Sequence, residues 1–176
     1  MKFKVFRFKK VSSTNNTAIR IINSSNINYG MIISENQIKG RGQYGKKWIS
    51  YKGNLFISFF YNIENFTISL KKLTYINCIL VKKLLSHYYK NKIILKKPND
   101  LLVDKKKICG ILQETFVKHS KKYLVVGIGV NLIKNPYIKN YPTTNLCDLI
   151  KKKISKKEIE NKIKKIFEYK LKKFYN

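Results

Sequence analysis

The 176-residue sequence lacks the features that would send a protein into or across a membrane. It contains no apolar run of the roughly 20 residues that a membrane-spanning helix needs. Its first residues, Met1 to Arg7, alternate charged and apolar side chains, whereas a secretory signal peptide needs an unbroken apolar stretch followed by small residues. We therefore expect no membrane partner and a cytoplasmic location.

Cysteine is scarce, and its spacing matches no known framework. Cys78, Cys109 and Cys147 are odd in number, lie far apart and include no C-x-x-C pair. This pattern is typical of free thiols in a reducing compartment. The sequence therefore predicts neither a disulfide framework nor a zinc site.

Arginine is also scarce, although the protein is strongly basic. The formal net charge is +29, yet only three of the 38 Lys and Arg residues are arginine. Lysine, isoleucine, asparagine, tyrosine and phenylalanine share A/T-rich codons, so biased base composition explains the lysine excess. Because arginine is the better ligand for phosphates and base edges, we keep a basic nucleic-acid-binding protein only as an alternative function. Non-specific polyanion binding at low salt is expected, but no specific DNA partner.

What remains is the composition of a globular domain, with 44% hydrophobic and 13% aromatic residues. Apolar runs and alternation predict strands at residues 3–8, 29–34, 54–61, 93–95, 101–103, 108–116 and 123–131. Capping signals at residues 12–15 predict a helix that runs to about residue 23, helical spacing predicts one at about 69–89, and a capping box that begins at Ser155 predicts a last one. With no repeat or linker, we expect one domain over residues 1–176 with an α+β fold, a mixed sheet with helices on one side.

The loop between the second and third predicted strands carries the motif Gly40-Arg41-Gly42-Gln43-Tyr44-Gly45-Lys46-Lys47-Trp48. Its G-x-G-x-x-G spacing matches the dinucleotide fingerprint, but a strand-like run follows instead of a helix, and no suitably placed acidic residue follows. The GKS or GKT of a Walker loop is absent too. A glycine-rich basic loop that binds a nucleotide phosphate remains, with Trp48 free to stack on a base or pack in the core. A flexible surface loop explains these residues equally well.

Four further segments favour the first interpretation. They are Ser13-Thr14-Asn15, Lys96-Lys97-Pro98-Asn99-Asp100, Lys105-Lys106-Lys107-Ile108-Cys109-Gly110-Ile111-Leu112 and Gly127-Ile128-Gly129-Val130-Asn131. Together with the loop and Gln37, they resemble the catalytic domain of biotin–protein ligases (biotin–[acetyl-CoA-carboxylase] ligases). The pattern of that family is S-T-N, Q-x-x-G-R-G-[RQ]-x-G-x-x-W, K-W-P-N-D, K-x-x-G-I-L and G-x-G-x-N. Each motif alone is weak, but the ordered set, which covers roughly residues 5 to 175, is specific.

The resemblance implies a fold like that of class II aminoacyl-tRNA synthetases and biotin ligases. It also implies a two-step reaction in which ATP, with Mg²⁺, converts biotin to biotinyl-5′-AMP. A lysine of a biotin carboxyl carrier protein, such as a subunit of acetyl-CoA carboxylase, then takes the biotin as an amide. The resemblance allows a homodimer.

Matching motif positions imply roles for individual residues. Arg41 and Lys107 would be the catalytic cations, placed where the biotin carboxylate and the α-phosphate meet. The implied biotin-binding residues are Ser13, Thr14, Asn15, Gln37, Arg41, Gly42, Gln43, Lys107 and Gly110. The implied ATP-binding residues are Arg41, Gly42, Gln43, Trp48, Asn99, Asp100, Lys107 and Asn131. No direct metal ligand is implied, and Mg²⁺ is expected near Asp100.

The glycine loop would be a mobile lid, because the mixed anhydride hydrolyses in water and a closed lid would protect it. Plainer alternatives exist for several assigned residues. Ser13 and Thr14 could be ordinary helix caps, Asn99 and Asp100 a turn, and Asn131 a strand end. Lys107 could be one lysine of a solvated turn, since only its position three residues before Gly110 distinguishes it.

The sequence departs from the family pattern in four respects. Gln43 replaces an arginine of the loop, Lys97 replaces the tryptophan of K-W-P-N-D, and Ser12 replaces an acidic residue. The fourth is that the chain ends at Asn176, where many members continue into a β-barrel. We also expect no operator binding, because the twelve residues before Ser13 are too few for a winged-helix domain. A lipoate ligase is a further alternative, although its R-R-x-S-G-G-G stretch is missing, and an inactive ligase remnant is another.

Overall fold

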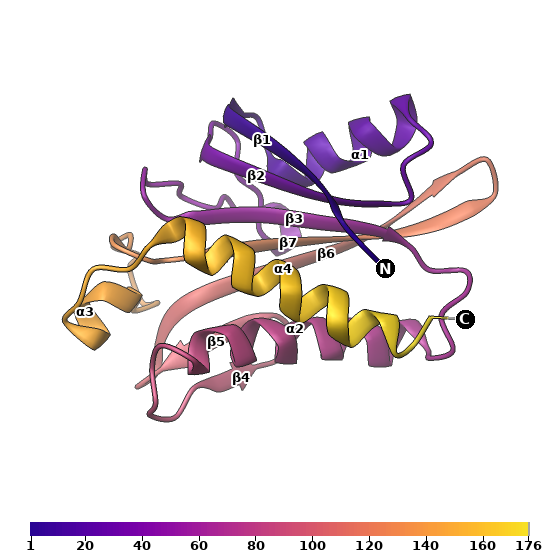
Figure 1. The fold of residues 1–176 in the computed structure, drawn as a ribbon. Helices are drawn as coiled ribbons and strands as arrows, with labels where there is room; N and C mark the ends of the chain where they lie inside the picture. Colours follow the sequence, from indigo (N-terminus) through magenta and orange to yellow (C-terminus); the bar gives the residue numbers. More distant parts are fainter. Residues whose placement is uncertain (176) are drawn as a thin grey trace.

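The computed structural model describes residues 1–175, which form a seven-stranded mixed sheet with helices packed on it (Figure 1). The strands are β1 (Lys4–Val11), β2 (Tyr29–Gln37), β3 (Leu55–Asn62), β4 (Ile94–Lys96), β5 (Asp100–Val103), β6 (Lys106–Lys118) and β7 (Lys121–Val130). The helices are α1 (Thr14–Ser24), α2 (Leu70–Ser86), α3 (Leu146–Ile150) and α4 (Lys156–Lys172). The strand order is β1-β2-β3-β7-β6-β5-β4, and only the β1–β2 pair is parallel among the described strands.

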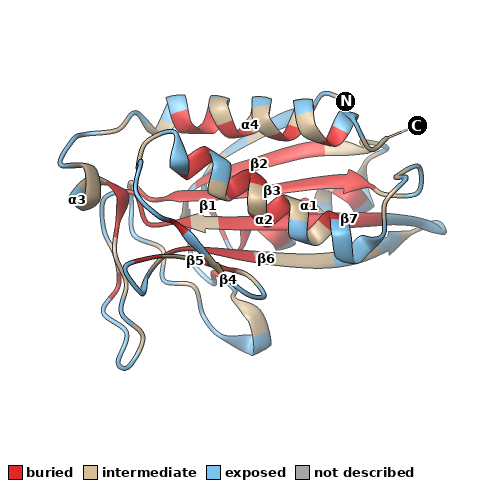
Figure 2. Cartoon of the chain, turned by 90° about the horizontal axis from the view of Figure 1, so that it is seen from below, coloured by how far each residue is buried: buried red, intermediate tan, exposed pale blue. Residues whose placement is uncertain are grey.

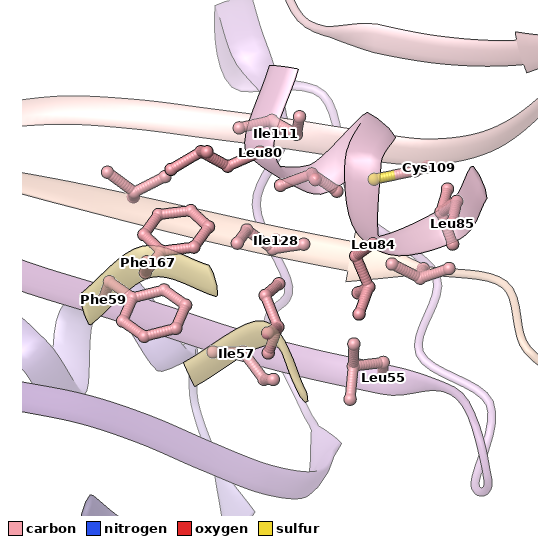
Figure 3. Packing of buried hydrophobic residues seen from close by; sticks show 14 of the residues in the cluster. Leu55, Ile57, Phe59, Leu80, Leu84, Leu85, Cys109, Ile111, Ile128 and Phe167 are labelled. Atoms are coloured by element: carbon pink, nitrogen blue, oxygen red, sulfur yellow. The ribbon is translucent and has the colours of Figure 1, made fainter. Parts of the chain in front are cut away.

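The larger core lies between the sheet and the pair α2 and α4. Leucines of α2 and the apolar stripe of α4 pack on alternate residues of β3, β6 and β7 (Figure 3). Phe167 of α4 stacks on Phe59 of β3, with ring centroids 4.2 Å apart and planes 6° from parallel. All of β3 and most of β7 are buried, whereas the outer helix faces are exposed (Figure 2).

Helix α1 covers the other face of the sheet. Its Ala18 and Ile22 pack against Ile32, Phe60 and Val125, which alternate with the strand residues of the larger core. The α+β prediction is confirmed, but the prediction that the helices lie on one side is wrong for α1. All eight residues of β3 are buried, and a strand buried on both faces needs a covering layer on each.

Local signals explain where the two long helices begin. The Ser69 and Ser155 side chains accept hydrogen bonds from the main-chain N–H groups of Lys72 and Glu158. The predicted capping box is only half made, because the Glu158 carboxylate instead accepts from Tyr88 Oη at 3.1 Å. The short α3 was not predicted. No helix within residues 1–175 is long and apolar enough to span a membrane.

Candidate active site

A cavity of about 780 Å³ opens on the face of the sheet that carries α1. Every residue to which the sequence assigned a catalytic, biotin-binding or ATP-binding role lines it: Ser13, Thr14, Asn15, Gln37, Arg41, Gly42, Gln43, Trp48, Asn99, Asp100, Lys107, Gly110 and Asn131. Lys97, one of the departures from the family pattern, lines it as well. The five motifs, far apart in the sequence, therefore meet around one cavity.

The N-terminus of α1 forms one wall of the cavity. Ser13 is the N-cap residue, but its side chain makes no capping hydrogen bond within the described chain. Gln37, at the end of β2, supplies the cap instead, since its Oε1 accepts from Thr14 N at 2.8 Å and from Thr14 Oγ1 at 3.1 Å. The Ser13 hydroxyl therefore does not cap the helix. The plainer alternative, in which Ser13 is an ordinary helix cap, is wrong for this side chain.

Asn15 is fixed in the floor of the cavity by both ends of its amide. Asn15 Nδ2 donates to Leu112 O at 3.3 Å and to Glu114 Oε2 at 2.7 Å, and Asn15 Oδ1 accepts from Ser58 Oγ at 2.5 Å. A Cβ atom at Gly127 would clash with Asn15 Oδ1, so only glycine fits beneath it. This packing accounts for the first glycine of the G-x-G-x-N motif.

The glycine loop is folded into a short hairpin over the sheet. Its two arms pair as Gly40 with Trp48, Arg41 with Lys47, and Gly42 with Lys46. The tip is a single 3₁₀ turn, Gln43–Gly45, in which Tyr44 and Gly45 have φ angles of 53° and 71°. Glycine adopts this left-handed region readily, which explains its place at the tip. Tyr44 is 91% exposed.

The Trp48 indole rests on two glycines of the sheet. A Cβ atom at Gly110 would lie 2.7 Å from Trp48 Cζ3, and one at Gly129 would come still closer to the ring. Within residues 1–175, Trp48 Nε1 and Asn131 Oδ1 are both buried without a hydrogen-bond partner. Buried polar atoms are normally paired, so these two atoms mark positions that a bound ligand would satisfy.

Lys107 lies inside the cavity, unlike the two exposed lysines before it. Its side chain is 18% exposed, and its Nζ lies 2.8 Å from Asp100 Oδ1, a contact of opposite charges rather than an aligned hydrogen bond. Tyr141 Oη donates to Asp100 Oδ2 at 2.6 Å. Lys107 Nζ also lies 5.5 Å from the ring centroids of Trp48 and Tyr141. The solvated-turn alternative for Lys107 is therefore wrong.

The main chain of Lys107 is clamped by the segment that follows β7. Lys107 N donates to Pro142 O at 2.8 Å, and Lys107 O accepts from Thr144 N at 2.9 Å. Asn131 Nδ2 donates to Thr144 O at 3.1 Å and so holds this segment in place. Asn131 is therefore more than a strand end, because it supports the clamp on Lys107.

The chemistry of the cavity is cationic, with one carboxylate. Asp100 is the one acidic residue among those that line the main cavity. Burial, and then the hydrogen bond to Asp100, raise the pKa of the Tyr141 phenol above its ordinary value, so it remains a neutral donor. Within residues 1–175, no group of three or more His, Cys, Asp or Glu side chains could hold a metal ion.

Two residues of the site were not predicted from the sequence. Glu114, whose Oε2 lies 2.7 Å from Arg41 Nη2, follows the K-x-x-G-I-L motif by two residues. The sequence feature that could have drawn attention to Glu114 is the scarcity of acidic residues, of which the chain has only nine. Tyr141 lies in an irregular segment downstream of Asn131, where no local pattern indicated its contact with Asp100.

The profile of the Biotin/lipoate A/B protein ligase family matches residues 7–131. The chain is 33% identical over 102 residues to the bifunctional ligase/repressor BirA of Escherichia coli, covering 57% of this chain and 32% of that protein. It is 35% identical over 139 residues to biotin–protein ligase 2 of Arabidopsis thaliana, covering 73% of this chain and 40% of that protein. The chain thus spans less than half the length of these relatives.

Solved structures with the same fold include the biotin protein ligase from Aquifex aeolicus in complex with biotin and ATP. The TM-score is 0.81 at 31% identity, covering 98% of this chain and 72% of that chain. The biotin protein ligase from Leishmania major in complex with biotinyl-5-AMP has a TM-score of 0.84, covering 98% of this chain and 76% of that chain. At 20% identity, the second likeness shows the fold alone.

Proposed function

The chain belongs to the Biotin/lipoate A/B protein ligase family, and on that premise we propose that it is an ATP-dependent biotin–protein ligase. The reaction would convert biotin to biotinyl-5′-AMP and then transfer the biotinyl group to a lysine of a biotin carboxyl carrier protein. A cytoplasmic location, where ATP is supplied, belongs to the same proposal.

The observation that carries the proposal is the convergence of five motifs on one cavity that holds two predicted catalytic cations. Arg41 enters from the glycine loop and Lys107 from β6, where its Nζ lies 5.5 Å from the centroid of the Trp48 ring. A reaction between two anions, a carboxylate and a triphosphate, needs positive charge where they meet. The cavity volume of about 780 Å³ lies in the range of sites that enclose small molecules.

In the first step, a carboxylate oxygen of biotin attacks the α-phosphorus of ATP. The bond from the α-phosphorus to the bridging oxygen of the β-phosphate breaks, and pyrophosphate leaves with the electron pair. Lys107 and Arg41 would stabilise the negative charge that accumulates on the α-phosphate oxygens. Ser13, Thr14 and Gln37 would orient the biotin ring at the α1 end of the cavity, as the matching motif positions imply.

In the second step, the neutral ε-amine of the acceptor lysine attacks the acyl carbon of the adenylate. The C–O bond to AMP breaks, an amide forms, and the amine loses a proton. Until then the adenylate must be kept from water, which is the role we assign to the glycine loop.

Mg²⁺ fits this site as a partner of the triphosphate rather than as a resident ion. Asp100 Oδ1 is buried and lies 2.8 Å from Lys107 Nζ without an aligned hydrogen bond. It would act as the single carboxylate ligand while Lys107 contacts the phosphates. Mg²⁺ is commonly held by one or two carboxylates together with substrate phosphates and water, where it neutralises phosphate charge. We propose that Asp100 holds it in this way.

The proposal is tested by adenylate formation. The purified protein is mixed with ATP, Mg²⁺ and either biotin or lipoate, and the acyl-AMP is measured by mass spectrometry. We expect biotinyl-AMP only, with its rate reduced about 100-fold or more in Lys107→Ala. Lys106→Ala is the matched control, because Lys106 is exposed at the start of the same strand. Lipoyl-AMP alone would contradict the biotin assignment, and the lack of either adenylate would contradict the ligase assignment.

A further inference from the structure

The described residues of this lysine-rich chain form few ion pairs, and two of these involve the predicted catalytic cations. Acidic residues number nine against 38 basic ones, so most cations have no carboxylate available. Lys107 nevertheless pairs with Asp100, and Arg41 pairs with Glu114. The Glu114 pair joins β6 to a loop 73 positions away in the sequence. Its role is not explained by either step of the reaction.

Glu114 is itself held firmly from the sheet side. Its Oε2 accepts from Asn15 Nδ2 at 2.7 Å, and Asn15 is fixed by Ser58 and by the missing side chain of Gly127. The carboxylate therefore extends a chain of hydrogen bonds from the buried centre of β3 to the surface of β6. Because the same oxygen also lies 2.7 Å from Arg41 Nη2, this chain ends on the glycine loop.

The pair between Arg41 and Glu114 can orient the guanidinium group while leaving most of its N–H donors available. The side chains of Arg41 and Glu114 are 38% and 28% exposed, so water screens their attraction. A guanidinium has five N–H donors, and the described contact to Glu114 uses one nitrogen. The remaining donors stay available for a phosphate or carboxylate in the cavity.

We propose that Glu114 is a positioning residue that holds Arg41, and with it the glycine loop, against the sheet before substrates bind. The inference rests on the proposed function, since it assigns Arg41 to adenylate formation. Through Asn15, the same carboxylate connects the biotin end of the cavity to the loop. Loss of the Glu114 carboxylate would leave the glycine loop less restrained and the Arg41 side chain less well oriented.

Chymotrypsin cleavage after Tyr44 tests the restraint without any substrate, because Tyr44 lies at the exposed tip of the loop. Glu114→Gln preserves the shape and an acceptor for Asn15 but removes the charge that attracts Arg41. We expect cleavage about two- to fivefold faster than in the parent protein, as suits a partly exposed ion pair. Glu64→Gln is the matched control, since Glu64 is an exposed acid in a turn.

A double-mutant comparison separates positioning from a general loss of structure. Arg41→Ala should accelerate cleavage as Glu114→Gln does, and Glu114→Gln should add nothing in the Arg41→Ala background. In adenylate formation, kcat should fall about tenfold in Glu114→Gln while the KM for biotin changes little, because Asn15 keeps its acceptor.

Cleavage of Glu114→Gln at the parent rate would overturn the proposal, and so would an undiminished effect of Glu114→Gln in the Arg41→Ala background. A protein that makes no adenylate would contradict the ligase assignment instead. The cleavage experiment would still report on Glu114, because it requires no catalysis.

Discussion

At the scale of single residues, the site depends on side chains that are held by partners distant in the sequence. Lys107 is fixed by Asp100, whose other oxygen accepts from Tyr141. Because a hydrogen bond to a charged group contributes about 1.5–3 kcal/mol, the Tyr141 contact is strong enough to decide where Asp100, and therefore Lys107, points. The geometry of the candidate site thus extends to residues outside the recognisable motifs.

Tyr141→Phe removes the hydroxyl that donates to Asp100 and leaves the ring in place. We expect adenylate formation to slow by about tenfold as the Asp100–Lys107 pair becomes less ordered. The rate is measured with saturating biotin and ATP, and Tyr137→Phe, at a 91% exposed tyrosine in the same segment, is the control. Parent-like rates in Tyr141→Phe would show that Asp100 needs no support from this hydroxyl.

Gly129→Ala places a methyl group where the Trp48 ring now lies. The ring must move, so we expect affinity for ATP to fall by about tenfold or more. Trp48 is the only tryptophan of the chain, so its fluorescence reports the displacement directly. An unchanged emission spectrum together with parent-like ATP binding would contradict the close packing of the indole on the sheet.

At the scale of elements, the sheet and the glycine loop contribute different residues to the candidate site. The sheet carries Lys107, Asp100 and Asn15's partners in fixed register, whereas the hairpin at residues 40–48 contributes Arg41 and Trp48 from above. The residues at the hairpin tip, 44–47, are exposed, including the aromatic side chain of Tyr44. An element of this kind is suited to closing over a reactive intermediate.

Binding of both substrates should protect the loop from cleavage. With biotin and ATP present, we expect chymotrypsin cleavage after Tyr44 to slow by about tenfold, because the closed loop packs on the adenylate. Biotin or ATP alone should protect less. Equal cleavage with and without the two substrates would argue against a lid.

Local sequence patterns predicted most elements, because glycines, caps and apolar spacing act over a few positions. The residues that line the cavity were assigned from the resemblance to biotin–protein ligases, which local patterns alone did not supply. The patterns did not predict that α1 and α2 cover opposite faces of the sheet. Because β3 is largely apolar on both faces, its sequence does not indicate which face a given helix covers. The pairs Arg41–Glu114 and Tyr141–Asp100 were also missed. These pairs depend on strand register and loop course, which no short motif encodes.

At the scale of the whole molecule, buried titratable groups make stability depend on pH. Burial raises the pKa of the Cys78 thiol from 9.0 to about 11, and it raises that of the Tyr61 phenol above its ordinary range. In the unfolded chain both groups lose their protons at lower pH, so the folded state holds more protons at high pH. The contribution of these two groups to the free energy of unfolding is therefore fully present below about pH 9 and is lost as the pH rises.

Urea denaturation at pH 8, 9, 10 and 11 measures this effect. We expect the midpoint to decrease steadily above about pH 9, and we expect a smaller decrease in Cys78→Ala. The comparison uses the change with pH within each variant, because Cys78→Ala also leaves a cavity. A midpoint that stays constant up to pH 11 would contradict the burial of these groups.

The central claim is that this cavity activates biotin and delivers it to a protein lysine. The most direct measurement is the intact mass of a biotin carboxyl carrier domain after incubation with the protein, ATP, Mg²⁺ and biotin. We predict the addition of one biotinyl group to a single lysine, dependent on ATP and lost with Lys107→Ala. An unmodified carrier domain, in a reaction where an established biotin–protein ligase modifies it fully, would contradict the claim.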